Sequence, residues 1–202
     1  MTVLCLPPRV SAQEAIEKFN QRKLRNLYGL LLKDIRVAAP GEPASRVPPF
    51  IERLWLPAYA VCVHAYLRDK ESRVWTTVDG LAGYSMFMDN VHELELRDLS
   101  EDAYPPGVTP EQAEAAARKG LLQYILRQRG QFNKPIIDAV EEVRLFHRPV
   151  WVLYYHRVGK NLDIKALDAY SGAPGGAKMR VAVLDALMNA RKTRLATEPA
   201  QL

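Results

Sequence analysis

Two histidines recur at matching places in the two halves of the sequence. His64 closes the run YAVCVH, and His156 closes the run WVLYYH 92 residues later. Imidazole groups that meet across a pseudo-twofold axis could bind a ligand or transfer protons. Cys62 stands two residues before His64, but neither histidine has a carboxylate beside it at helix or strand spacing, and two histidines alone do not make a metal site. We therefore predict two satisfied strand histidines and keep an enzyme that uses His64 and His156 as an alternative.

Two aspartates recur as well, and each comes four residues before a glycine. Asp79 precedes Gly83, and Asp168 precedes Gly172. Paired carboxylates can perform acid–base chemistry, but an aspartate at such a turn commonly accepts hydrogen bonds from backbone N–H groups. We predict the structural role for both aspartates.

No other motif predicts a cofactor or a metal. The glycine-rich segment 172–178 lacks the spacing of a phosphate-binding loop, so we expect it to lead into a helix. Cys5 and Cys62 lie far apart without metal-ligand spacing, which favours two inert thiols over a disulfide. We assign no catalytic residues, no metal ligands and no cofactor.

Aromatic residues are concentrated in and beside the segments that carry the histidines. A sheet of exposed aromatic rings with nearby arginines could stack the bases of single-stranded nucleic acid, although core packing is the commoner role of such residues. The candidate binding residues are His64, Tyr66, Trp75, Trp151, Tyr154 and His156.

Two similar segments, 57–83 and 149–172, must position these candidates. Pro57 matches Pro149 at an offset of 92, and the turn aspartates match at an offset of 89. Each segment has the pattern of two alternating strands joined by a polar loop, so we predict two antiparallel hairpins. The first strand of each hairpin carries apolar or aromatic residues on both of its faces. This pattern predicts a sheet partly covered on both faces, or a surface that meets a partner.

A helix is predicted before each hairpin. Capping boxes begin at Ser11 and Thr109, and an apolar stripe follows each of them. The first stripe includes Ile16, Phe19, Leu24, Leu27 and Leu31, and the second Ala113, Ala117, Leu121, Tyr124 and Ile125. A further amphipathic helix near the C-terminus has a stripe of Ala177, Val181, Leu184 and Met188.

These elements predict an α+β fold in which two helix-plus-hairpin repeats form a shared or adjacent antiparallel sheet, with the helices packed on one face. Residues 91–97 are expected to add one strand with an acidic face. The Pro-Pro-Gly sequence at 105–107 marks the boundary. It divides the chain into a first repeat (1–104), a linker (105–108) and a second repeat with the C-terminal helix (109–202), which could also form one compact domain.

The second hairpin resembles the PepSY family. Its strand 151–155 is followed by the turn sequence LDAYSG at 167–172, and members of that family end a hairpin in a similar Asp-Ala-x-(Ser/Thr)-Gly turn. The first hairpin carries the less similar sequence VDGLAG at 78–83. The resemblance covers about thirty residues of each copy. It implies small α+β modules that act as interaction or regulatory domains, often outside the cytoplasm, without catalytic residues.

Charge and composition favour a protein partner. The net charge is +5, but an acidic stretch at 89–114 separates two basic ones, whereas a nucleic-acid-binding protein usually has a continuous basic face. The first residues lack the pattern of a secretory signal, and no run approaches the ~20 apolar residues of a membrane span, so we expect a cytoplasmic protein. We predict a non-catalytic binding or regulatory protein that contacts another protein or its own copy. Two alternatives to this function are a single-stranded nucleic-acid-binding protein and the enzyme that uses His64 and His156.

Overall fold

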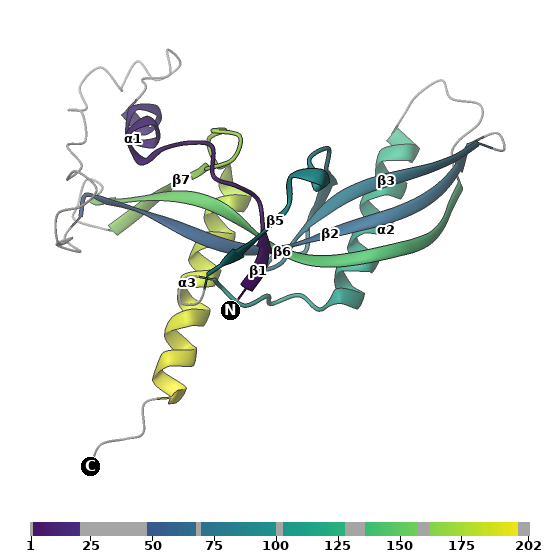
Figure 1. The fold of residues 1–202 in the computed structure, drawn as a ribbon. Helices are drawn as coiled ribbons and strands as arrows, with labels where there is room; N and C mark the ends of the chain where they lie inside the picture. Colours follow the sequence, from purple (N-terminus) through teal and green to yellow (C-terminus); the bar gives the residue numbers. More distant parts are fainter. Residues whose placement is uncertain are drawn as a thin grey trace.

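The chain has a mixed α+β fold, as predicted. The structure is a computed structural model that describes residues 2–20, 48–67, 70–99, 103–127, 136–156 and 162–197, with side chains up to residue 190. This part contains three α-helices and one seven-stranded, mostly antiparallel sheet (Figure 1). The elements are β1 (Thr2–Cys5), α1 (Ala12–Asn20), β2 (Phe50–Leu67), β3 (Lys70–Asp79), β4 (Ser85–Phe87), the 3-10 helix η2 (Val91–Glu93), β5 (Glu95–Asp98), α2 (Pro110–Arg127), β6 (Ile136–His156), β7 (Leu162–Asp168) and α3 (Ala177–Thr197).

The two longest strands, β2 and β6, form the antiparallel centre of the sheet. Both carry a proline near the middle. Pro57 O accepts a hydrogen bond from Gly80 N, and Pro149 O accepts one from Ala169 N, both at 3.0 Å. Within a strand the nitrogen and the oxygen of one residue point to the same side, so both prolines turn their nitrogen away from the central ladder. The pairing of β2 with β6 is therefore compatible with both prolines.

The sheet continues outward from this centre in the order β4-β3-β2-β6-β1-β5, and β7 pairs with β6 beside β1. Strands β2 and β3 form the first predicted hairpin, and β6 and β7 form the second. Oδ1 of Asp79 and of Asp168 each accepts two hydrogen bonds from backbone N–H groups of the turn, at 2.7 to 3.0 Å. Gly83 and Gly172 close these turns with positive φ of 69° and 71°, where a Cβ is disfavoured. These bonds confirm the predicted turn role of both aspartates.

Both predicted capping boxes are formed. Ser11 N donates to Glu14 Oε2 at 2.8 Å, and Glu14 N donates back to Ser11 Oγ at 3.2 Å. Thr109 and Gln112 exchange the same two bonds at 2.9 and 3.3 Å. The part of the first stripe that includes Leu24, Leu27 and Leu31 lies outside the described residues.

The chain leading into each helix is anchored on a hairpin turn. The backbone N–H groups of residues 9–10 both donate to Ala169 O, and those of residues 107–108 both donate to Gly80 O, at 2.8 to 2.9 Å. The predicted linker thus lies against the first hairpin, in the same way that the N-terminal segment lies against the second.

Helices α1 and α2 each pack on the hairpin of the other half of the chain. Although α1 precedes β2, its Ala15 packs against Leu167 of β7. Although α2 precedes β6, its Ala117 packs against Val61 of β2. Because side chains alternate along paired strands, these contacts lie on the same face of the sheet.

Helix α3 lies on the opposite face, so the prediction that the helices pack on one face holds for α1 and α2 and is wrong for α3. Its Val183 contacts the cluster that contains Val152 and Ile164, whose side chains alternate with those facing α1. The stripe predicted along this helix is wrong as well, because Val181 and Met188 are 52% and 59% exposed. The buried side is made of Ala182, Val183 and Ala186. Small side chains let this helix lie close to the sheet.

Residues 91–97 form a strand only in their second half. Glu93 N donates to Asn90 O at 3.0 Å and closes η2, because asparagine favours a turn over a strand. The following strand β5 pairs antiparallel with β1, and β1 contacts β6 in parallel where Cys5 lies opposite His147.

A buried ion pair lies where β2 and β6 cross the middle of the sheet. Arg148, which is opposite Leu56, donates to Oδ2 of Asp79, and both side chains are buried. Burial disfavours the guanidinium charge, but Asp79 and Tyr84 together raise the pKa of Arg148. The turn of the first hairpin is thus tied to a strand of the second half.

Replacement of Asp79 with alanine tests this ion pair. We expect Asp79→Ala to lower the free energy of unfolding by about 3–5 kcal/mol, because it leaves the Arg148 charge buried without its partner. The matched variant Asp168→Ala removes equivalent turn bonds and should cost about 1–2 kcal/mol. Chemical denaturation measures both values. If both variants lost the same free energy of unfolding, the ion pair would add no stability beyond that of the turn hydrogen bonds.

His147 makes the stability of this centre depend on pH. Its Nε2 lies 3.0 Å from Tyr104 O, so Nε2 carries the proton of the neutral ring. Burial lowers the pKa of His147 below its ordinary value, although the bond to Tyr104 acts in the other direction. The unfolded chain therefore takes up this proton first as the pH falls.

Acidification should therefore destabilise the native protein more than a variant without this imidazole. Between pH 7.5 and 5.5 we expect the protein to lose on the order of 1 kcal/mol more stability than His147→Gln, in which the amide can replace the Nε2 donor. Denaturation at the two pH values measures the difference. Parallel losses in both proteins would contradict the lowered pKa.

Candidate binding surface

Three of the six predicted binding residues share one face of the first hairpin. Along β2 and β3, Cys62 pairs with Trp75 and His64 with Arg73, and Tyr66 follows on the same face. Helix α2 covers the opposite face. We call this surface the open face, and it comprises Cys62, His64, Tyr66, Glu71, Arg73, Trp75, Asp138, Glu141, Glu142 and Arg144.

The outer end of the open face surrounds His64. Its Nδ1 lies 3.5 Å from Oδ2 of Asp138, and its Nε2 lies 3.7 Å from Oε2 of Glu71. The ring of Tyr66 contacts the imidazole edge to face at 4.7 Å between centroids. The sequence indicated no carboxylate beside His64, because these two come from the neighbouring strands β6 and β3. Only the strand register could have revealed them.

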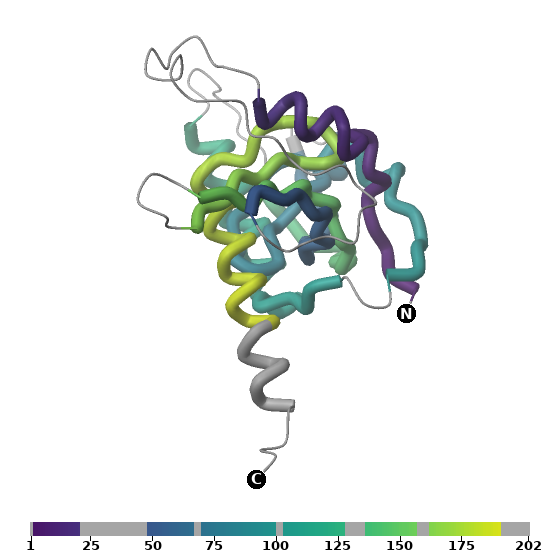
Figure 2. Tube along the Cα trace, turned by 90° about the vertical axis from the view of Figure 1, so that its left-hand side faces the viewer, coloured from purple at the N-terminus to yellow at the C-terminus, as the bar shows by residue number. Residues whose placement is uncertain are grey.

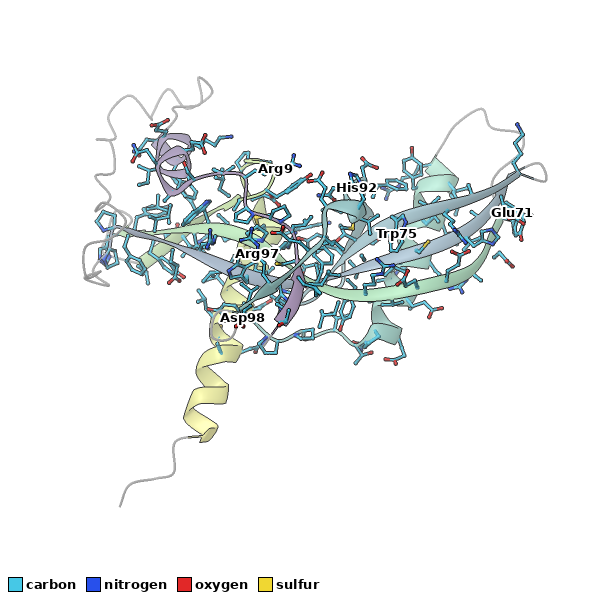
Figure 3. All side chains as sticks on the ribbon, viewed as in Figure 1. Arg9, Glu71, Trp75, His92, Arg97 and Asp98 are labelled. Atoms are coloured by element: carbon cyan, nitrogen blue, oxygen red, sulfur yellow. The ribbon has the colours of Figure 1, made fainter. Side chains whose placement is uncertain are left out.

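The inner end of the open face is built around Trp75. The guanidinium of Arg144 lies 5.4 Å from its ring centroid and also donates to Glu142. Arg73 forms an ion pair with Glu141 at 2.9 Å. Figure 3 shows Glu71 at the tip of this hairpin and Trp75 nearer the centre of the molecule. The face thus combines aromatic rings with four carboxylates and two guanidinium groups.

The other three predicted residues lie elsewhere. Tyr154 is buried on the α3 side, stacks on Phe50 at 4.5 Å and donates to Glu52. Trp151 packs on the α1 side and donates its indole N–H to Val10 O at 2.8 Å. Both have structural contacts that a local sequence pattern does not reveal.

His64 and His156 do not face each other, so the expectation that the two histidines could meet in one site is wrong. His156 lies at the end of β6 opposite Leu162, just beyond the pairing of Tyr154 with Phe50. His64 lies near the other end of the β2 and β6 pair, where Tyr66 is opposite Ile136. Antiparallel pairing places matching ends of two similar strands far apart, so the two imidazoles cannot act on one substrate.

The two hairpins differ in how these faces are covered. Tyr154 follows Cys62 by 92 residues, and its face lies beneath α3. On the first hairpin, Leu6 and Met88 cover the inner part around Ala58. Beyond this cover the charged side chains of the open face are exposed, among them Glu71, Arg73, Asp138 and Arg144. The sequence predicted either partial coverage or a partner surface. Among the described residues a helix covers this face of the second hairpin, whereas on the first hairpin the cover is limited to the inner part.

The described residues contain no group of three or more histidine, cysteine or acidic side chains that could hold a metal ion. None of the described helices is long and apolar enough to cross a membrane. No protein-family description, curated protein or solved structure shows a significant match to the chain.

The one thiol of the open face is a poor nucleophile. Burial raises the pKa of Cys62, and the nearby Glu141 carboxylate raises it further. We therefore expect a thiol reagent such as DTNB to modify the folded Cys5→Ser variant at least ~100-fold more slowly than the unfolded one, with a rate that still rises above pH 9. Absorbance at 412 nm measures the rate. Rapid labelling at neutral pH would contradict the buried, protonated thiol.

Proposed function

We propose that the protein is a non-catalytic binding or regulatory protein and that the open face is where it contacts another protein. One observation carries the proposal. The chain covers this face of its second hairpin with α3 but leaves the outer part of the first hairpin without a helix among the described residues. Half-buried aromatic rings beside exposed charges are typical of a surface completed by a partner.

We further propose that the two halves are copies of one helix-plus-hairpin unit related to PepSY domains. The matching aspartate turns, capping boxes and bonds that anchor the helix leads support this. Under this interpretation the partner supplies to the first hairpin what α3 supplies to the second, namely a helix laid across the sheet.

The charge of the open face favours a positively charged partner helix. Carboxylates outnumber guanidinium groups on it, and Glu71 and Asp138 lie near His64 rather than near an arginine. Excess negative charge repels phosphate, so the aromatic rings of this face are poorly suited to single-stranded nucleic acid.

Charge reversal on the open face tests the proposal. Tagged full-length protein would be purified from its native host, and the copurifying protein identified and produced separately. We expect Glu71→Lys and Asp138→Lys each to weaken its binding roughly tenfold, measured by isothermal titration calorimetry. Glu17→Lys on the exposed side of α1 is the matched control and should leave the affinity unchanged.

Three results would overturn this function. A partner whose affinity is insensitive to both reversals would place binding elsewhere. Tight, salt-dependent binding of a labelled single-stranded oligonucleotide would support the nucleic-acid alternative. A small molecule retained in native mass spectrometry, with no protein partner, would support an enzyme or a ligand carrier.

A further inference from the structure

We propose that two copies of this chain pair edge to edge through β5, with a twofold axis at Leu96, to form one sheet that continues across both copies. β5 ends the strand order of the sheet and, within the described residues, pairs only with β1. Figure 2 shows β5 at the outer rim of the molecule, beside the purple β1. An outer strand presents unpaired N–H and C=O groups to any second strand.

The side chains of β5 are unusually suited to such pairing. Leu96 is 72% exposed, far more than its cross-strand neighbour Leu4, which packs against the core. Glu95 and Arg97 project from the other face of the strand and are bonded to each other. An exposed leucine at a sheet edge has an apolar surface that a second strand would bury.

The sequence of β5 is self-complementary in one antiparallel register. With the axis at Leu96, this residue lies opposite Leu96 of the partner copy. Glu95 then lies opposite Arg97 of the partner copy, and the reciprocal pair forms on the other side of the axis. Directly opposite residues of unlike charge stabilise strand pairing, and this register forms two such pairs.

This arrangement differs from a protected edge. Charged residues at a sheet edge usually prevent pairing, but that requires like charges to meet when two edges approach. In β5 the opposite charges of Glu95 and Arg97 lie two residues apart, so each meets the opposite charge of the second copy. Because β5 is only four residues long and this register pairs just Glu95, Leu96 and Arg97 with the same strand of the second copy, the contact is smaller than a standard stable interface. We expect a reversible dimer with a Kd of roughly tens to hundreds of micromolar.

Sedimentation velocity across ~5 to 500 µM protein, a range that spans this Kd, tests the proposal. We expect the native chain to shift from monomer to dimer. The single reversals Glu95→Arg and Arg97→Glu should each raise the Kd at least ~10-fold, because like charges then meet at both contacts. An equimolar mixture of these two variants should dimerise again, since every Arg of one chain then faces a Glu of the other.

Matched controls separate this effect from misfolding and from the proposed partner surface. The exchanged variant E95R/R97E keeps both the internal pair and the contacts between copies, so it should dimerise like the native chain. Far-UV circular dichroism should be unchanged in all variants, and Glu71→Lys should dimerise normally, because it lies on the open face. A native chain that remains monomeric at the highest concentration would overturn the proposal. So would a dimer that tolerates the single reversals, or a mixture that fails to recover.

Discussion

The antiparallel pairing of β2 with β6 is the constraint on which the other elements depend. It joins a strand from each half of the chain over most of their length, and every other sheet strand is attached outside this pair. The two prolines are tolerated because their nitrogens point away from the shared ladder. Arg148 and Asp79 add a buried ionic tie between the same two halves. One register holds from Phe50 to Cys62 and sets which side chains share a face there, and it shifts between Cys62 and Ala65.

The two hairpins present the same face of the sheet, but with different side chains and different cover. The same face carries Val152 and Tyr154 beneath α3 on one side, and on the other Cys62 and His64, which no helix in the described part of the chain covers. A sheet face that is apolar along its whole length needs a cover. One that carries aromatic rings between ion pairs can stay in contact with water.

The sequence predicted what short local patterns determine. The hairpins, the two aspartate turns and the two capping boxes each depend on a few neighbouring residues, and each is present. Where a feature depends on contacts with a distant segment, the prediction was wrong or the feature was not predicted. The stripe on α3 was assigned to its large residues, although the alanine-rich side packs on the sheet, and the carboxylates beside His64 come from other strands. No local pattern carries the strand register that decides these contacts.

The exchange of helices between the halves has a consequence for how the molecule comes apart. Since α1 covers the second hairpin and α2 covers the first, neither half can loosen without uncovering apolar strand residues of the other. Amide protons in both hairpins should then open together, as one cooperative unit, rather than as two independent folding blocks. During synthesis the first hairpin leaves the ribosome before the helix that shields it, which makes this interval the one most exposed to misassociation.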